Sequence, residues 1–387
     1  MENVVLFDGG NAVALQPFTF TRPVGDIRVG ILTIAEKWTL HLNAHISYLT
    51  EPYLQAKYPF ENREGNCFID ASLLPTPHLV QAIRNLKEGE ALCEAGKSIA
   101  FRVRKQEGQT ENSPRMEIPY TQSLHRLQHH YDIFRLNGQE LASDFELLCT
   151  YRKSAPLSAS NRLIGNPAHL FIEEGATIEA STLNCQTGYI YIGKESEIME
   201  NCAIRGPFAL CNHAMLKMGS NVYGATTVGP HCKVGGELSN VVFFGYSNKA
   251  HDGFLGNSVI GEWCNLGADT NASNLKNNYA SIRIWDYEKQ TFADTGLQFS
   301  GLLMGDHTKC GISTMFNSGT VTGVGCNLFG HGYHRNFIPS FSYGHAQTGY
   351  DRYRIDKIVE TARVVFARRN KNFDAIEEEI LRHLFTL

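Results

Sequence analysis

Residues 192–238 read IGKESE IMENCA IRGPFA LCNHAM LKMGSN VYGATT VGPHCK VGGEL when they are divided every six residues. Most blocks carry a small residue in fifth place, and every block opens with an aliphatic residue: Ile192, Ile198, Ile204, Leu210, Leu216, Val222, Val228 and Val234. Two apolar positions in six do not make an amphipathic helix, whereas they suit a short strand followed by a tight turn. Three such strands close one triangular coil. The repeat therefore predicts a left-handed parallel β-helix, a prism of stacked coils.

The same register returns in three further runs, at Ile172 and Ile178, at Ile260 and Leu266, and from Met304 to Thr322. Between these runs the phase is broken twice, over residues 240–259 and 271–303. The second interruption is too long for a turn, so we expect it to leave the prism as a loop. Because the regular coils of a solenoid only make core, its interruptions are where function is expected.

The sequence on either side of the prism has a different pattern. In residues 1–155, the strand-like runs NVVLFD and CFIDASLLP alternate with the helical runs VGILTIAEKWTLHLN and PHLVQAIRNLKEG, which predicts an α/β domain with a parallel sheet. The polar stretch GQTENSPRM indicates a surface loop, and YRKSAPLSAS indicates a linker. We expect the prism over residues 160–345. A tail over 346–387 is expected to form helices, with Asp374 as a cap, that pack on the prism or on a neighbouring subunit.

The composition excludes several classes of partner. A net charge of -4, from 35 basic and 39 acidic residues, gives no basic field for nucleic acid or for an anionic membrane. Because neither an export signal nor an apolar span is present, we expect a soluble cytoplasmic protein. The ten cysteines form no CxxC pair, and several occupy fifth places of the repeat, so we expect reduced thiols in the core.

One stretch resembles a known family. AHDGFLGNSVIGEWCNLGADTNASNL, residues 250–275, resembles the acetyltransferase half of bifunctional N-acetylglucosamine-1-phosphate uridylyltransferases/glucosamine-1-phosphate acetyltransferases, with His, Leu-Gly, Ile-Gly, Asn, Gly-Ala and Thr in the same order. DTGLQFSGLLMGDHTKCGISTMF, LQPFTFTRPVGDIRVGILTIAEKW and YDIFRLNGQELASDF resemble the archaeal and alternative bacterial branch of that family. The similarity runs over nearly the whole chain.

The resemblance implies an acetyl-CoA-dependent site on the prism. It makes His251 the general base, a role that suits a group titrating near neutral pH. It makes Asn274 the residue that orients this histidine. Sugar contacts fall on Glu237, Phe254 and Asn265, and backbone N–H groups of Ala268 and of the neighbourhood of Gly311 hold the coenzyme. Phe254 lacks the tyrosine hydroxyl of the family, and Ser239 replaces its phosphate-binding lysine. Prisms of this type resemble trimers with the acyl site between subunits, so we expect a homotrimer.

The N-terminal domain departs further from the pattern of the family. Nucleotidyltransferases of this class begin with G-x-G-[ST]-R, and this chain has DGGNAVALQPFTFTRPVGDIR instead. Here Gly9 and Gly10 admit a close approach of phosphates to the backbone, Arg22 supplies positive charge, and Asp70 is expected to hold Mg²⁺ beside the nucleotide.

These features predict a transferase with two activities, acting on a sugar 1-phosphate and a nucleoside triphosphate. It acetylates glucosamine 1-phosphate and then couples the product to UTP, giving UDP-N-acetylglucosamine. One alternative retains a single activity, either acyl transfer or sugar-1-phosphate nucleotidyl transfer with UTP or dTTP. A third interpretation takes the prism as a zinc hydratase, because HGYH places His331 and His334 close together.

Overall fold

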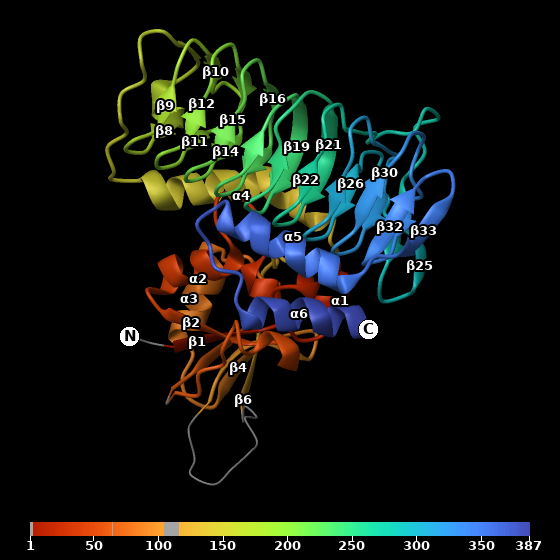
Figure 1. Ribbon diagram of the computed structural model, residues 1–387. Helices are drawn as coiled ribbons and strands as arrows, with labels where there is room; N and C mark the ends of the chain where they lie inside the picture. Colours follow the sequence, from red (N-terminus) through yellow and green to blue (C-terminus); the bar gives the residue numbers. More distant parts are fainter. Residues whose placement is uncertain (1–2, 64, 104–115) are drawn as a thin grey trace. The chain divides into compact units, whose positions relative to one another are not determined.

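The computed structural model describes residues 3–63, 65–103 and 116–387, and the chain divides into two compact units (Figure 1). The first unit comprises Met1–Leu15, Thr21–Ile27 and Leu32–Gln128, and the second comprises Gln16–Phe20, Arg28–Ile31 and His129–Leu387. The loop predicted at GQTENSPRM falls almost entirely outside the described residues.

The N-terminal unit contains a six-stranded sheet in the order β2-β1-β3-β5-β4-β6. Its strands are β1 (Asn3–Phe7), β2 (His45–Leu49), β3 (Cys67–Asp70), β4 (Glu90–Glu94), β5 (Lys97–Arg102) and β6 (Met116–Pro119). β1 pairs in parallel with β2 and β3, as predicted. β5 instead runs antiparallel to both β3 and β4, because Ala95 and Gly96 take positive φ values and close a two-residue hairpin. β4 pairs in parallel with β6, so β5 is the one strand of this sheet that runs against its neighbours, and the α/β prediction is confirmed.

Helices follow the strands of this unit: α1 (Asn11–Ala14), the 3-10 turns η2 (Val24–Asp26) and η3 (Pro52–Leu54), α2 (Ile34–Leu42) and α3 (Pro77–Asn85). α2 begins later than the run VGILTI suggests because Thr33 and Glu36 form a capping box, in which each side chain bonds the backbone N–H of the other residue. α3 has a Thr76 cap and a proline at its first position.

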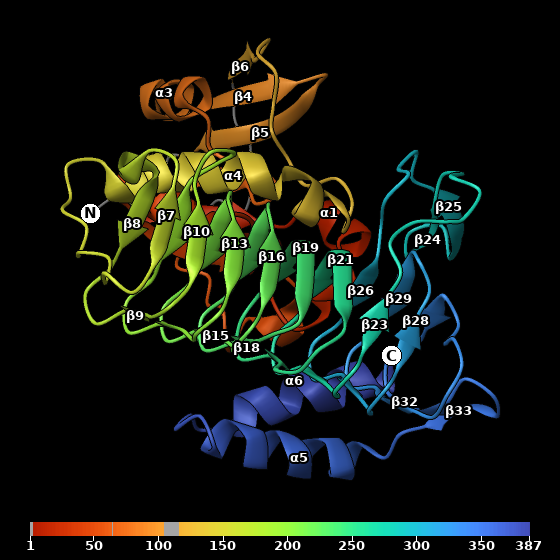
Figure 2. The same ribbon diagram turned by 90° about the horizontal axis from the view of Figure 1, so that it is seen from above.

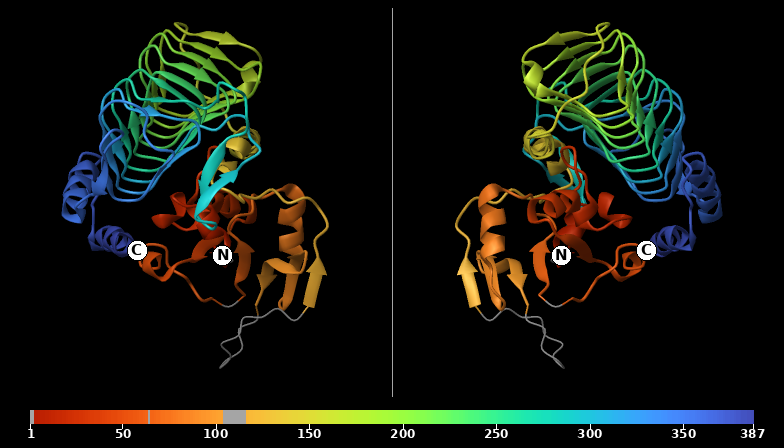
Figure 3. Two further views of the ribbon diagram at one scale, coloured as in Figure 1. Left: turned by 90° about the vertical axis from the view of Figure 1, so that its right-hand side faces the viewer. Right: turned by 90° about the vertical axis from the view of Figure 1, so that its left-hand side faces the viewer.

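The second unit is a parallel β-helix with three faces, seen from the side in Figure 2 and nearly end-on in Figure 3. Face 1 contains β7 (Arg162–Ile164), β10 (Thr182–Asn184), β13 (Ala203–Arg205), β16 (Asn221–Tyr223), the first halves of β19 (Glu237–Phe243) and β21 (Phe254–Ile260), β23 (Asn271–Ala272) and β28 (Met315–Phe316). Face 2 contains β8 (Leu170–Ile172), β11 (Ile190–Ile192), β14 (Phe208–Leu210), β17 (Thr226–Val228), the second halves of β19 and β21, β26 (Leu302–Met304), β29 (Thr320–Thr322) and β31 (Phe337–Ile338). Face 3 contains β9 (Thr177–Ile178), β12 (Glu197–Ile198), β15 (Met215–Leu216), β18 (Lys233–Val234), β20 (Asn248–Lys249), β22 (Asn265–Leu266), β27 (Lys309–Cys310), β30 (Asn327–Phe329), β32 (Ser342–His345) and the antiparallel β33 (Gly349–Arg352). The predicted β-helix is confirmed.

The aliphatic openers of the repeat fill the prism in rotation. Ile192 lies on face 2, Ile198 on face 3 and Ile204 on face 1, and all eight openers from Ile192 to Val234 are buried. The first predicted break is a shortening of the coils and not an excursion: Lys233 pairs with Asn248, 15 residues on, where Glu197 pairs with Met215, 18 residues on. As a result Leu238, expected in a fifth place, points inward from face 1.

The second predicted break does leave the prism. The chain departs after β23 and forms an antiparallel hairpin of β24 (Arg283–Asp286) and β25 (Thr291–Asp294) before it returns in β26. The hairpin folds back over face 2, where the Trp285 ring stacks on Phe337 at a centroid distance of 4.0 Å. Ile282 is fully buried under Gly319, whose missing Cβ would lie 2.6 Å from the Ile282 side chain.

Helix α4 (Asp132–Cys149) belongs with the prism, although the predicted domain boundary near residue 155 placed it with the N-terminal sheet. The Asn137 side chain donates to Ala225 O at 2.6 Å and accepts from Thr227 Oγ1 at 3.1 Å on face 2. Gly138 permits this approach, because a Cβ there would lie 3.1 Å from that of Ala225. The 3-10 turns η1 (Phe18–Phe20) and η4 (Pro167–His169) also lie in this unit.

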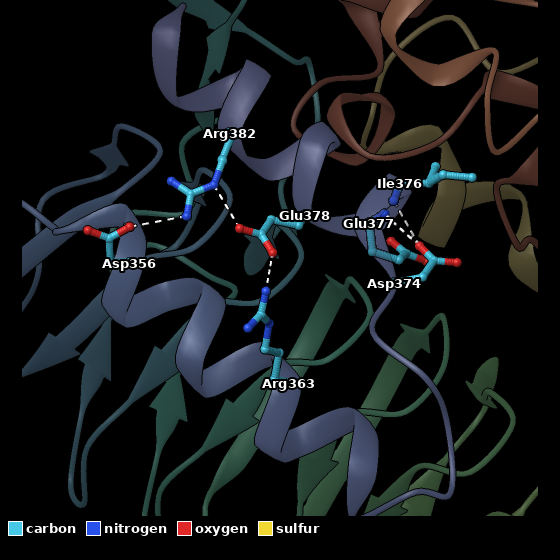
Figure 4. Close-up of polar contacts among 7 residues, drawn as sticks. All are labelled: Asp356, Arg363, Asp374, Ile376, Glu377, Glu378 and Arg382. Atoms are coloured by element: carbon cyan, nitrogen blue, oxygen red, sulfur yellow. Dashed lines mark hydrogen bonds and ion pairs between the residues drawn. The ribbon is translucent and has the colours of Figure 1, made fainter.

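The tail forms two helices, α5 (Ile355–Ala367) and α6 (Ala375–Thr386), joined by side-chain contacts shown in Figure 4. Asp374 caps α6 as predicted, accepting from the backbone N–H groups of Ile376 and Glu377 at 3.0 Å. Arg382 bridges Glu378 of its own helix and Asp356 of α5, at 2.8 and 3.1 Å. α5 packs on the prism through Phe366, which confirms the expected docking of the tail.

All ten cysteines are free and buried, as predicted. Burial raises the pKa of the Cys232 thiol to about 12 and that of Cys326 to about 11. Across the residues that the structure describes, helices with the length and apolar character of a membrane span are absent.

Candidate active site at a corner of the prism

His251 lies on the corner between faces 3 and 1, in the four-residue turn 250–253 that joins β20 to β21; we call this turn the His251 corner. Its side chain is exposed. The turn above it contains Ala268, since Asp269 N donates to Asp252 O at 3.1 Å. The next turn contains Gly311 to Thr314, since Ser313 N donates to Ala268 O at 2.8 Å. The predicted base and the predicted coenzyme-binding backbone thus occupy three successive levels of one edge.

The predicted sugar contacts lie on both sides of this edge. Glu237 and Phe254 are register partners on the outer surface of face 1, beside the corner, and Asn271 accepts from Phe254 N at 2.8 Å. Asn265 is exposed on face 3, where it pairs with Asn248. Because the edge of a prism is convex, Asn265 points away from the side on which Glu237 and Phe254 lie.

Asn274 lies at the other edge of face 1 from His251. Its amide Nδ2 donates to Asn257 Oδ1 at 2.8 Å, and a Cβ on Gly256 would lie 2.4 Å from that same Nδ2. Asn257 and Asn240 lie at the bends of β21 and β19, between the paired residues of the two strands, and both have positive φ. In this structure the amide of Asn274 is therefore bonded to Asn257 at the corner between faces 1 and 2.

The predicted nucleotide residues gather at the carboxyl ends of β1 and β3. Asp70 ends β3 opposite Phe7, and its carboxylate accepts from Asn11 Nδ2 at 3.1 Å and from Ser72 Oγ at 2.7 Å. Gly9 and Gly10 follow β1 and are exposed; Gly9 has φ of 54°. Ligands of open α/β sheets bind at this end of the strands. Arg22 is buried, with its guanidinium 3.7 Å from Asp26.

Asp8 is a second carboxylate at this edge, and the sequence interpretation missed it. It accepts from Val24 N at 2.8 Å and from Thr50 Oγ1 at 2.5 Å. The pKa of Asp8 is raised to about 6, chiefly by burial and in smaller part by the nearby charges of Glu51 and Asp70. Two carboxylates at one edge of the sheet offer the oxygen ligands that a hard divalent cation prefers, so the residues present fit Mg²⁺ held together with substrate phosphates.

The zinc interpretation receives no support from the geometry. His334 of HGYH is buried, with its ring Nδ1 2.7 Å from Tyr350 Oη, and burial lowers the pKa of its imidazole to about 4. Within residues 3–63, 65–103 and 116–387, His, Cys, Asp and Glu form no group of three or more that is suited to a metal ion.

Lys249 is the other functional candidate that the sequence interpretation missed. It stands in an inward position of face 3, in line with Val234, and is fully buried. Its Nζ donates to the carbonyl oxygens of His251 at 2.8 Å, Asp252 at 3.2 Å and Gly235 at 3.2 Å. The hexad count gave no signal, because Lys249 falls within residues 240–259 where the phase is broken, and the pairing of β20 with β18 is what shows it to be inward.

Residues 4–153 match a family model described as sugar nucleotidyl transferase. This match confirms the prediction of an enzyme of the transferase class, and it covers the N-terminal part of the chain and not the prism. A comparison with curated proteins finds no match.

Solved structures that resemble the chain include three acyltransferases. A UDP-N-acetylglucosamine acyltransferase from Campylobacter jejuni is 11% identical, with a TM-score of 0.30 over 53% of this chain and 94% of that chain. AntD, an N-acyltransferase from Bacillus cereus in complex with dTDP and 3-hydroxybutyryl-CoA, is 15% identical, with a TM-score of 0.24 over 52% and 89%. A second UDP-N-acetylglucosamine acyltransferase is 13% identical, with a TM-score of 0.25 over 59% and 86%. At this distance the likenesses carry no argument about the reaction of this chain.

Proposed function

We propose that this chain is a cytoplasmic enzyme with two activities that makes UDP-N-acetylglucosamine from glucosamine 1-phosphate, acetyl-CoA and UTP. The observation that carries the proposal is the union, in one chain, of a domain that matches sugar nucleotidyl transferases with a hexapeptide prism whose edge presents His251. The sequence resemblance over residues 250–275 supports the choice of substrates.

In the acetyl transfer, His251 takes a proton from the amine of glucosamine 1-phosphate as the nitrogen attacks the thioester carbonyl. A positioned base of this kind contributes about 10²–10⁴-fold. Backbone N–H groups of Ala268 and of the turn at Gly311 stabilise the oxyanion of the tetrahedral intermediate. The intermediate then expels the coenzyme A thiolate, which recovers a proton from the imidazolium.

The geometry of the edge supports a homotrimer. A small-molecule site is normally concave, whereas one copy offers the sugar contacts on two faces of a convex edge. A neighbouring copy set against this edge would supply the missing wall, so that Glu237 and Phe254 of one copy and Asn265 of another face the same ligand.

In the second reaction, a phosphate oxygen of N-acetylglucosamine 1-phosphate attacks the α-phosphorus of UTP, and pyrophosphate leaves. Exposed backbone at Gly9 and Gly10 contacts the phosphates and Arg22 adds positive charge nearby. Asp8 and Asp70 are the residues that would hold Mg²⁺, which when bound neutralises charge on the phosphates.

Two assays on the purified protein test the proposal. Release of coenzyme A with glucosamine 1-phosphate should fall by about 10²-fold or more in His251→Ala, and pyrophosphate should be released from UTP with N-acetylglucosamine 1-phosphate. Unchanged coenzyme A release in His251→Ala would remove the base. Preference for dTTP with glucose 1-phosphate, or silence of one assay, would favour the single-activity alternatives.

A further inference from the structure

The corner between faces 3 and 1 is closed in the same way on three of its levels. The residue in fifth place carries a hydroxyl, which donates to the carbonyl oxygen three residues earlier. Ser220 donates to Lys217 O at 2.5 Å, Thr270 to Gly267 O at 2.7 Å and Thr314 to Gly311 O at 2.8 Å. Each turn thus satisfies its own inward carbonyl without burying a charge.

Two successive levels between Ser220 and Thr270 have glycine, and therefore no hydroxyl, at this position. The register of the strands aligns Ser220 with Gly236, Gly236 with Gly253, and Gly253 with Thr270. Gly253 has φ of 116°, and a Cβ there would lie 2.2 Å from Thr270 O, so no side chain can be restored at this position. Asp252 O accepts from Asp269 N, but the carbonyls of Gly235 and His251 need another donor, because a buried carbonyl without one is costly.

Lys249 supplies that donor to both levels at once. Its three acceptors are Gly235 O on the lower level and the carbonyls of His251 and Asp252 on the upper one. The glycines leave room for the ammonium, since a Cβ on Gly236 would lie 2.9 Å from Lys249 Nζ. A cation inside a hydrophobic prism is an expensive replacement for a hydroxyl, and it stands under the one turn that bears the candidate base.

We infer that Lys249 is a positioning residue for acyl transfer: by holding the backbone carbonyls of His251 and Asp252 from inside the prism, it fixes the direction in which the His251 imidazole leaves the edge. The inference rests on the proposed role of His251. Loss of the three bonds would free the corner to shift, and a displacement of about 1 Å at a catalytic group can cost about 10²-fold in rate.

Lys309 provides a matched control. Its Nζ also donates to two corner carbonyls, Trp263 O at 3.0 Å and His307 O at 2.8 Å, and burial lowers the pKa of Lys309 and of Lys249 alike to about 8. These acceptors belong to the corner between faces 2 and 3, away from His251.

The experiment compares Lys249→Met, Lys309→Met and His251→Ala in coenzyme A release from acetyl-CoA with glucosamine 1-phosphate. We expect Lys249→Met to lower kcat by about 10²-fold, with little change in KM for acetyl-CoA, and Lys309→Met to keep kcat within about twofold while losing similar thermal stability. In a double-mutant cycle, Lys249→Met should add little to the loss caused by His251→Ala, because the two act through one group.

The outcomes separate the two hypotheses. Full activity in His251→Ala overturns the proposed base and the role of Lys249 with it. Loss of activity in His251→Ala, with Lys249→Met behaving like Lys309→Met, overturns the inference about Lys249 alone, as do losses that simply add in the double variant. If Lys249→Met does not fold, Lys249→Gln replaces it, since glutamine keeps a neutral donor of shorter reach. The kcat of Lys249→Gln is then compared with that of Lys309→Met, and the double-mutant cycle with His251→Ala is repeated, with the same criteria for overturning the inference.

Discussion

The rings of Trp263 and Phe366 stack with centroids 3.8 Å apart and planes 20° apart, which joins α5 to the corner between faces 2 and 3. Trp263 continues a column of rings along this corner, in which Tyr246 lies at 4.3 Å and His231 follows at 4.8 Å. Each of these three corner residues has positive φ, so the same backbone turn repeats on each level and aligns the rings.

Removal of the Phe366 ring should loosen the tail. Phe366 is buried, and truncation of a buried phenylalanine costs about 3 kcal/mol. We expect Phe366→Ala to lower the midpoint of urea unfolding accordingly, whereas Val364→Ala, at a side chain of the same helix that is 57% exposed, should leave it nearly unchanged. Equal midpoints for the two variants would show that the stack contributes nothing to stability.

Lys249 should give the free energy of unfolding a distinct pH dependence. Burial lowers its pKa to about 8 in the folded state, against about 10.4 in an unfolded chain. Between these values the unfolded state binds more protons, so this group makes the wild type more stable as pH rises from 8 to 10 and contributes no slope below 8. The stability difference between wild type and Lys249→Met should grow by about 2–3 kcal/mol over that window. A constant difference in denaturant unfolding from pH 7 to 10 would contradict the buried ammonium.

Asp8 should set the acid limit of nucleotidyl transfer. Because burial raises its pKa to about 6 in the metal-free protein, protons compete with Mg²⁺ for Asp8 as pH falls through 6, so pyrophosphate release at subsaturating Mg²⁺ should fall below that point. Asp8→Asn should abolish the reaction at every pH. Glu51→Gln removes a neighbouring negative charge, so it should move the midpoint to lower pH; a midpoint that stays in place would exclude Asp8 as the titrating group.

His334 should make the fold sensitive to acid. Burial lowers its pKa to about 4, while an unfolded histidine titrates near about 6.5. Below 6.5 the unfolded state takes up the proton first, so stability is lost as pH falls from 6.5 to 4. Replacement by the neutral ring in His334→Phe should flatten the pH dependence of the melting temperature in that range. His331→Phe, at an exposed position of the same HGYH motif, should leave the slope as it is.

The hexad period predicted the prism because each aliphatic opener, from Ile192 to Val234, can be buried only by pointing into the interior of the coil. The period failed where the coils shorten: Leu238 matched a fifth place by counting, yet the register of β16 and β19 pairs it with the opener Val222. Lys249 was missed for a related reason, since a lysine at an inward position contradicts the pattern that found the fold. Only the pairing of β20 with β18 reveals it as a core residue.

The candidate sites were predictable where they are local in sequence and not where they depend on pairing. His251, Ala268 and Gly311 fall on one edge because the repeat stacks them. Asp8 became a candidate only when the pairing of β1 with β3 set it beside Asp70. Helix α4 was assigned to the N-terminal sheet by chain order, and nothing local in Asn137 or Gly138 indicates that they fit against Ala225.

The buried cysteines allow local opening of the prism to be measured. Since alkylating reagents attack thiolates and not sealed thiols, a native molecule should take up label only where a coil opens. Cys202, Cys264 and Cys326 stand at different heights along the stack, so mass spectrometry of timed labelling would read out from which end the solenoid unravels.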